Sequence, residues 1–361
     1  MPVSPLHPQV YLDFRFYLQS LEQYRSLSFM ELLDKFITFY QRPFSEQFGH
    51  IIAGPVFPGL VGIFDYNPKN TLPLATFYLG MSCILSFAWL KYLSSNGVGL
   101  IWLIALALAP NPIWFTLIIS PDILFATLIA FFHYFYFKSG RKLSDSAFWL
   151  VFLLLILLTR PNGYSILLFV FIDFGYRLVR GDKDSLPGVA FFSILVALFA
   201  LYLYPYFITE ARKTVADAIF FGLKTSDYRT GLFSDLPRFL DLVISWTALA
   251  AAKLLYFVGL RPTYGDTSWW LVLLRASAGV ILLPGLILVA FRAPRREQLF
   301  LAMFFLPIFF GPTQDRYNLP LFAIMFRYGS IVWDYVFARL LKGSGLAKVA
   351  SKWNSQRNRA A

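Results

Sequence analysis

Long apolar runs separated by short polar stretches dominate the chain. A helix that crosses a membrane needs about 20 mainly apolar residues, and nine runs approach that length. They cover residues 72–92, 98–118, 122–138, 147–160, 162–179, 187–207, 269–291, 298–312 and 317–341. The pattern predicts an all-α fold, a polytopic bundle of about nine transmembrane helices.

Two interruptions refine this pattern. The first is Arg160-Pro161-Asn162-Gly163, where we predict a tight turn because proline lacks a backbone donor and glycine ends helices. The second is the apolar stretch at residues 239–260. If this stretch crossed the membrane, the basic loop at 292–296 would lie on the outer side. We interpret residues 239–260 as an amphipathic or re-entrant helix at the outer face. Asp241, Lys253 and Arg261 are then expected near water.

Composition agrees with a membrane location. Of the 361 residues, 58% are hydrophobic and 14% are charged, whereas soluble domains carry about 25% charged residues. The mean hydropathy is +0.60. The surface is therefore not wholly water-facing. The single cysteine, Cys83, excludes an internal disulfide framework.

The net charge of +12 fits either nucleic-acid binding or cytoplasmic loops rich in Lys and Arg. Clusters of basic residues lie in three loops and a tail: Lys138, Arg141 and Lys142; Arg177, Arg180 and Lys183; Arg292, Arg295 and Arg296; Arg339, Lys342, Lys348, Lys352, Arg357 and Arg359. If the spans alternate, these share one side with Lys91, while the opposite turns near Ser120, Arg160 and Asp315 carry almost none. The positive-inside rule then predicts a cytoplasmic C-terminus and no nucleic-acid partner.

This topology divides the chain into an outer segment, residues 1–71, and a transmembrane bundle, residues 72–361. The bundle includes an outer loop at 208–268 and a basic cytoplasmic tail at 339–361. No apolar span precedes residue 72, and Met1 to Gln9 do not form a signal peptide. Either a first helix lies upstream or the following span translocates the N-terminus, and we favour a helix upstream.

Candidate chemistry lies in the outer segment. Asp13 sits in a loop near the membrane, where a carboxylate can act as a general base toward a hydroxyl. Asp is also a preferred helix N-cap, and from the residues alone capping of a helix at 14–25 is favoured. Arg42, Glu46 and His50 are secondary candidates in the same segment.

Three further charged residues lie at outer turns. Asp122 starts a span, where capping is the favoured role. Arg160 and Arg316 are isolated between long apolar runs, and ionisable groups at such depth are costly and often functional. A guanidinium binds the oxygens of a lipid-linked phosphate in a forked manner. The alternatives are snorkelling to the interface or pairing with Asp122 or Asp315.

Several common chemistries have no motif here. A phosphate-binding Gly-x-x-x-x-Gly-Lys-Ser/Thr loop and a Gly-x-Ser-x-Gly nucleophile turn are both missing from the sequence. Three histidines and one cysteine are too few for an ordinary His/Cys zinc site. We expect His133, which lies among Phe and Tyr within a span, to be packed and neutral.

The order of the short motifs resembles a known family. An outer Asp13 precedes a Gly-Pro-x-x-Pro stretch; Ser120-Pro121-Asp122, Leu158-Thr159-Arg160-Pro161-Asn162-Gly163 and Asp315-Arg316-Tyr317-Asn318-Leu319-Pro320 follow in that order. This order is similar to that of the GT-C superfamily of integral membrane glycosyltransferases. That superfamily includes protein O-mannosyltransferases, aminoarabinose transferases and the PIG-V/PIG-M mannosyltransferases.

The resemblance implies transfer of a sugar from a polyprenyl-phosphate donor to an acceptor hydroxyl of a glycan, lipid or protein on the outer face, as in cell-envelope glycan biosynthesis. It implies that Asp13 is the base, that Arg316, Tyr317 and Asp122 lie near the donor phosphate, and that Arg160 has a positional or phosphate-related role. A divalent metal is compatible with the family. However, position 15 is Arg15 rather than the second acid of a two-acid motif, so we predict no metal site.

Three other functions compete with this one. A transporter or flippase for a lipid-linked saccharide typically has paired interrupted helices in its two halves, which the sequence does not show. An O-antigen-type polymerase or ligase shares long outer loops and isolated arginines, and the loop at 208–268 fits it in part. A non-catalytic assembly subunit is the third alternative.

Overall fold

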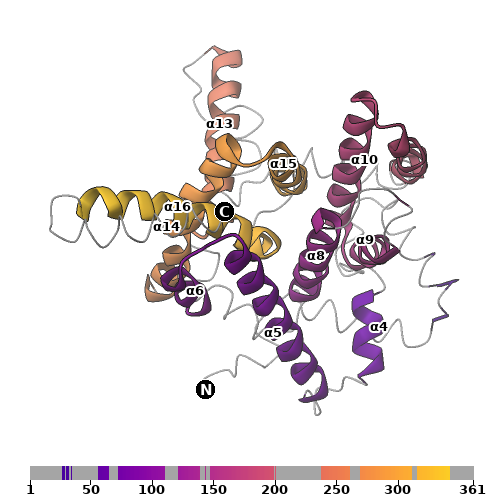
Figure 1. Cartoon of the computed structure of the whole chain (residues 1–361), viewed down its shortest axis with the longest axis horizontal. Coiled ribbons are helices and arrows are strands. Elements are labelled where there is room, and N and C mark those ends of the chain that lie inside the picture. Colours follow the sequence, from indigo (N-terminus) through magenta and orange to yellow (C-terminus); the bar gives the residue numbers. More distant parts are fainter. Residues whose placement is uncertain are drawn as a thin grey trace.

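A computed structural model describes part of the chain. The described residues are 27–28, 30–31, 34, 56–64, 72–109, 121–138, 143, 147–198, 200, 237–260, 269–310 and 315–341. Within these ranges every regular element is helical and no strand occurs, which confirms the predicted all-α class for this part of the chain. Figure 1 shows the arrangement.

The described helices lie close to the predicted apolar runs. They are α4 (Val56–Ile63), α5 (Leu72–Ser95), α6 (Leu100–Ala107), α8 (Pro121–Lys138), α9 (Ala147–Thr159), α10 (Tyr164–Val179), α13 (Arg238–Phe257), α14 (Trp269–Arg292), α15 (Arg295–Phe310) and α16 (Phe322–Leu341). Three short 3₁₀ segments join them: η3 (Pro161–Gly163), η4 (Lys183–Ser185) and η6 (Asp315–Leu321). A further helix covers residues 186–198.

Membrane-spanning capacity is shown for fewer helices than predicted. Among the described residues, two helices, Leu72–Ser95 and Asn318–Leu340, are long and apolar enough to cross a membrane. Three apolar helices are shorter: Pro121–Phe137, Ala147–Thr159 and Ala276–Arg292. In Figure 1, α13 runs up the view whereas α16 runs across it, so the described helices do not form one parallel set. The bundle of nine spans therefore stays a prediction.

The predicted tight turn is confirmed. Helix α9 ends at Thr159, η3 follows, and α10 begins at Tyr164. The Gly163 amide donates to the Arg160 carbonyl oxygen at 2.9 Å. A Cβ on Gly163 would lie 2.8 Å from the Ile156 carbonyl oxygen, so the turn is tight enough to require glycine.

Helices α14 and α16 cross at two glycines. A Cβ on Gly285 would lie 1.9 Å from the Met325 carbonyl oxygen, and a Cβ on Gly329 would lie 2.1 Å from the Ile281 carbonyl oxygen. The two backbones therefore touch, as small residues allow where helices pack in lipid. Because η6 leads directly into α16, this crossing also holds η6 in place.

Aromatic side chains fill the space between α8, α9, α10 and α15. Tyr136 packs edge-on against Trp149 at 5.3 Å between ring centroids, and Phe169 packs against Phe300 at 5.1 Å. Trp149, Tyr136 and Phe300 are fully buried. His133 stacks on Phe137 at 4.3 Å and is packed among aromatic rings, as expected. Large rings at these positions fix the spacing of the four helices, because close-packed interiors leave little room for adjustment.

The structure corrects the placement of Lys253. The sequence pattern predicted it near water on a surface helix, but Lys253 is 0% exposed. Burial in helix α13 increases along its length: Phe239, in its first turn, is 75% exposed, whereas Phe257, at its end, is fully buried. The end of α13 packs against η6 and against Phe305 of α15, with 5.4 Å between the rings of Phe257 and Phe305.

Candidate functional site

The predicted site residues fall into three groups. The candidate base Asp13 and the secondary candidates Arg42, Glu46 and His50 lie outside the described residues. For Arg316 and Tyr317 the backbone lies in η6, but their side chains are outside the description. Asp122 and Arg160 are described in full.

Asp122 and Arg160 form a buried ion pair. Asp122 lies in the first turn of α8, and Arg160 immediately follows α9. The Arg160 Nη1 donates to Asp122 Oδ1, and the two residues are 7% and 4% exposed. The structure thus shows the pairing that the sequence left as one alternative. Asp122 also carries its charge at the N-terminal end of a helix dipole, where a carboxylate is favoured.

Segment η6 packs against two helices. It contacts α8 and α13. The Asn318 Nδ2 donates to the Phe257 carbonyl oxygen at 2.9 Å, and Asn318 is fully buried. This bond anchors the segment that carries Arg316 and Tyr317 to the end of α13. We call Asp122, Arg160 and η6 the Asp122 cluster.

Helix α15 links α8 to the end of α13. Phe304 packs against Phe125, one turn beyond Asp122, at 6.3 Å between ring centroids. The next residue, Phe305, packs against Phe257. The start of α8, the end of α13 and η6 are therefore joined around one stretch of α15. We infer that residues 121–122, 160–163 and 315–320, which belong to three separate motifs of the sequence, lie in one region.

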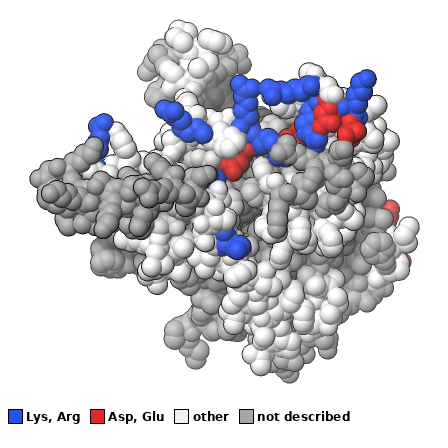
Figure 2. Space-filling view, in the orientation of Figure 1, with Lys and Arg blue, Asp and Glu red and all other residues white. Residues whose placement is uncertain are grey.

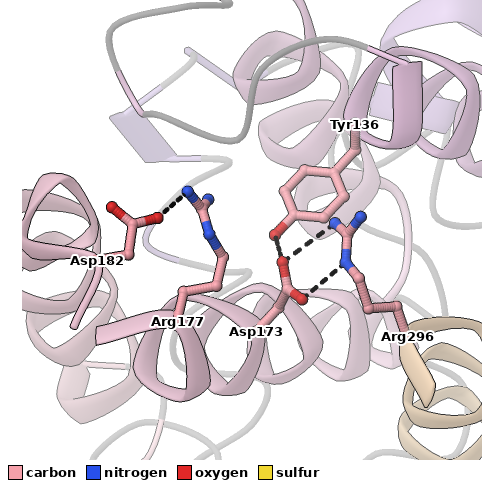
Figure 3. A network of polar contacts seen from close by, with 5 residues as sticks. All are labelled: Tyr136, Asp173, Arg177, Asp182 and Arg296. Atoms are coloured by element: carbon pink, nitrogen blue, oxygen red, sulfur yellow. Dashed lines mark hydrogen bonds and ion pairs between the residues drawn. The ribbon is translucent and has the colours of Figure 1, made fainter. Parts of the chain in front are cut away.

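A second polar group, the Asp173 cluster, lies at the other end of α8 (Figure 3). Tyr136 donates to Asp173 Oδ2 at 2.7 Å, and Arg296 donates to both oxygens of the same carboxylate, at 2.8 and 3.1 Å. The Arg296 guanidinium also lies 4.8 Å from the centre of the Phe137 ring. Since Tyr136 is fourteen residues after Asp122, the two clusters are about 21 Å apart along α8.

Next to it, Arg177 pairs with Asp182 just beyond the end of α10 (Figure 3). Desolvation raises the pKa of the Asp182 carboxyl, but the hydrogen bond and charge of Arg177 outweigh it and hold that pKa below its ordinary value. The pair closes the turn that leads into η4.

A third polar group, the Glu297 cluster, joins α5, α15 and α16. Tyr328 donates to Glu297 Oε2 at 2.7 Å, and the Arg327 Nη1 lies 3.4 Å from Glu297 Oε1 and donates to the Tyr92 hydroxyl at 3.2 Å. Glu297 directly follows Arg296 of the Asp173 cluster. Each of these two clusters combines one carboxylate, one guanidinium and at least one tyrosine, so each is close to charge-neutral.

The residues of these two clusters were not predicted from the sequence. The available signal was a lone charge inside an apolar run, which is costly in lipid unless paired. Asp173 follows Phe-Val-Phe-Ile, and Arg327 follows Ala-Ile-Met-Phe. Pairing partners 123 and 30 residues away (Arg296 and Glu297) have no sequence signal. We therefore interpret the two clusters as hydrogen-bonded ion pairs that hold neighbouring helices together.

The Asp122 cluster has a different chemical character. It joins a buried guanidinium and a buried carboxylate to a segment that carries a second arginine, Arg316, and Lys253 is buried in the last turns of α13, against which this segment packs. Together with Lys253, the cluster holds three basic residues against two acidic ones, Asp122 and Asp315, and guanidinium and ammonium groups bind anionic oxygens. No group of three or more His, Cys, Asp or Glu able to hold a metal ion occurs among the described residues. Comparison with protein-family models, with curated proteins and with solved structures gave no match.

Proposed function

We propose that the chain is an integral membrane glycosyltransferase that moves a sugar from a polyprenyl-phosphate donor to an acceptor hydroxyl on the outer face of the membrane. One observation carries the proposal. Asp122 and Arg160 form a buried ion pair at the start of α8, and η6 packs against the same helix; the three come from motifs far apart in the sequence. A pocket that binds one ligand requires such convergence.

A membrane location is supported by side chains as well as by helix length. Large apolar side chains are exposed along several helices, where a soluble protein would carry polar ones. They are Leu79, Phe87, Ile101, Ile104, Val151, Leu154, Ile194, Ile287 and Phe291. Two described helices are long and apolar enough to cross a bilayer. Hydrocarbon tails are the solvent that suits such a surface.

The distribution of charge supports the orientation. In Figure 2 the Lys and Arg side chains of the described surface gather mainly toward the upper edge, together with Asp and Glu. Arg180, Lys183, Arg292 and Arg295 are exposed residues in the loops that end α10 and join α14 to α15. In the proposed orientation these loops face the cytoplasm, and the Asp122 cluster lies toward the opposite side.

The chemistry follows from the donor. The acceptor oxygen forms a bond to the anomeric carbon, and the bond from that carbon to the phosphate oxygen breaks. The acceptor proton passes to a base, for which Asp13 is the sequence candidate. The leaving polyprenyl phosphate gains negative charge, which the Arg160 and Arg316 guanidiniums would stabilise. Preorganised donors of this kind each contribute about 3 kcal/mol to the lowering of the activation barrier.

Asp122 has a positioning role in this scheme. A free arginine side chain has many rotamers, and ordering them on binding costs free energy. The ion pair with Asp122 holds the Arg160 guanidinium in one place before the donor arrives. No metal is needed, since the cations that face the phosphate are side chains.

The proposed function is tested by incubating the purified, reconstituted protein with radiolabelled polyprenyl-phosphate sugars. We expect the label to leave the lipid and to appear on a glycan, lipid or protein acceptor, and we expect Asp13→Asn to abolish this transfer at unchanged expression. A flippase would move the labelled lipid across the bilayer without loss of the label. Label that stays on the lipid with every donor and acceptor would contradict the proposal.

A further inference from the structure

Two exposed basic loops lie beyond the Asp173 cluster. Arg180 and Lys183 lie where α10 ends, and Arg292 and Arg295 lie where α14 meets α15; all four residues are exposed. In Figure 2 the Lys and Arg side chains of the described surface gather mainly toward the upper edge. We call these four residues the basic surface.

One ion pair connects the two loops of the basic surface. Arg296, in the first turn of α15, donates to both oxygens of Asp173 on α10, at 2.8 and 3.1 Å. Arg295 directly precedes Arg296, and Arg180 lies seven residues after Asp173, about 10 Å along α10. Helices α10 and α15 also pack against each other. The four cations therefore lie on neighbouring elements, although the two loops are far apart in the sequence.

The carboxylates near the basic surface do not cancel its charge. Three of them are bonded to arginines outside the surface: Asp182 to Arg177, Asp173 to Arg296 and Glu297 to Arg327. Within the described residues of the two loops, Asp184 is the remaining carboxylate. The four basic residues thus stand against one acid, and the surface has a net positive charge.

Strongly exposed apolar side chains lie directly beside two of these cations. Val179, which precedes Arg180, is 87% exposed, and Phe291, which precedes Arg292, is 78% exposed. Hydrocarbon tails suit the side chains of Val179 and Phe291, whereas an arginine beside them places its charge in the headgroup layer. Both loops therefore mark the border between hydrocarbon and headgroups, which is where lipid phosphates lie.

We propose that the basic surface binds the headgroups of anionic phospholipids. A lipid phosphodiester accepts charge-assisted hydrogen bonds from guanidinium and ammonium groups, and basic residues beside a membrane attract anionic lipid. A zwitterionic lipid offers the same phosphate but adds a cation, which the basic surface repels. The net charge of the headgroup thus defines the partner. This inference goes beyond the proposed function, because it does not depend on sugar transfer.

Equilibrium binding in mixed micelles of detergent and lipid tests the basic surface. The full-length protein is purified in a neutral detergent, and radiolabelled phosphatidylglycerol or phosphatidylcholine is added in equal amounts. We expect the wild-type protein to bind phosphatidylglycerol about tenfold or more tightly than phosphatidylcholine at low ionic strength, since each basic residue near an anionic surface contributes about fivefold. High salt should reduce this preference, because it screens exposed charges.

Neutralising the basic surface should remove the preference. The variant Arg180→Gln/Lys183→Gln/Arg292→Gln/Arg295→Gln should bind the two lipids with nearly equal affinity. The other Lys and Arg residues of the chain are unchanged in this variant, so the loss would locate the binding. The matched control is Arg180→Lys/Arg292→Lys/Arg295→Lys, which keeps every charge and should keep the preference.

Thermal unfolding in detergent shows whether the neutral variant folds, as expected for four exposed positions. If it does not unfold cooperatively, Lys183→Gln alone replaces it and should reduce the preference by about fivefold.

The outcomes separate this inference from the proposed function. Equal affinity of the wild-type protein for the two lipids would overturn the inference, and so would an undiminished preference in the neutral variant. Loss of the preference in the charge-preserving control would show that charge is not its cause. None of these results bears on sugar transfer. A protein that prefers phosphatidylglycerol but releases no label from polyprenyl-phosphate sugars would keep the basic surface and contradict the proposed function.

Discussion

Each end of α8 has a buried carboxylate that is bonded to an arginine. At one end, Asp122 pairs with Arg160 out of water; at the other end, Asp173 receives bonds from Tyr136 and Arg296. A buried ion pair is not in itself a source of stability, because desolvation offsets the attraction between its charges. Removing one member, however, takes a paired charge away from a buried group. The two ends of α8 therefore differ in their proposed role, which is ligand binding at the Asp122 end and contact between helices at the Asp173 end.

We predict that Asp122→Asn or Arg160→Met destabilises the folded protein by about 3–5 kcal/mol, since each removes one partner of a buried ion pair. The double variant Asp122→Leu/Arg160→Met should recover most of that loss. Thermal unfolding in detergent measures both effects, with the exposed Arg339→Met as control. Additive losses in the double variant would show that the two side chains do not act as a pair.

A pH effect is expected at Asp182. Its pKa is lowered in the folded state by Arg177, so the stability that it contributes is fully present above the ordinary Asp pKa of about 3.9 and is lost as the pH falls through the lower folded value. Arg177→Gln should therefore flatten the decline in melting temperature between pH 5 and strongly acidic pH, by a small amount because Asp182 is exposed to solvent screening.

Arg180→Gln is the control for this effect. Arg180 stacks on Tyr176 at 4.6 Å and lies in the same turn, but Asp182 is paired with Arg177. The melting temperature of Arg180→Gln should fall at acidic pH by the same amount as that of the wild-type protein. An unchanged decline in Arg177→Gln would remove the ion pair as the cause.

At the scale of elements, the α14–α16 crossing depends on two glycines. Adding a methyl group at Gly285 or Gly329 places a carbon within about 2 Å of a backbone oxygen on the other helix, so the helices must separate. We predict that Gly285→Ala and Gly329→Ala each destabilise by about 1–3 kcal/mol or more, and that each also lowers sugar transfer because η6 moves with α16. Melting temperature and label transfer are the measurements.

Gly80→Ala and Gly175→Ala are the matched helical controls. Nothing lies within 4 Å of a Cβ at either position. Because alanine favours helices over glycine by about 1 kcal/mol, these two variants should be as stable as the wild-type protein or slightly more so. Equal losses in all four variants would refute a specific crossing.

The helices were largely predictable from the sequence, and the contacts between them were not. The apolar runs and the interruption at Arg160–Gly163 predicted the positions of most helices. Run length and the effects of glycine and proline depend on the local sequence alone. The burial of Lys253 was missed, since whether a charged residue lies on the buried side depends on what packs against the helix. The Asp122–Arg160 pair was available as an alternative because both residues lie at turns of the same predicted side. The pairing of Glu297 with Arg327 had no comparable signal.

At the scale of the whole molecule, the proposed function requires two chemically different ends. The Asp122 cluster, where the proposed donor binds, lies about 21 Å along α8 from the Asp173 cluster, and the exposed basic loops lie beyond the latter. In the proposed membrane orientation these ends face opposite solutions. The sugar would then be transferred outside, while Lys and Arg remain at the cytoplasmic surface.

Labelling of single cysteines in intact cells or sealed vesicles tests this claim most directly. The native Cys83 is exposed and is first replaced by alanine; Asp13→Cys, Arg316→Cys and Lys183→Cys are then made one at a time. We predict that a membrane-impermeant thiol reagent labels positions 13 and 316 from the outside and position 183 only after the membrane is opened. Labelling of positions 13 and 316 from opposite sides would contradict a shared site.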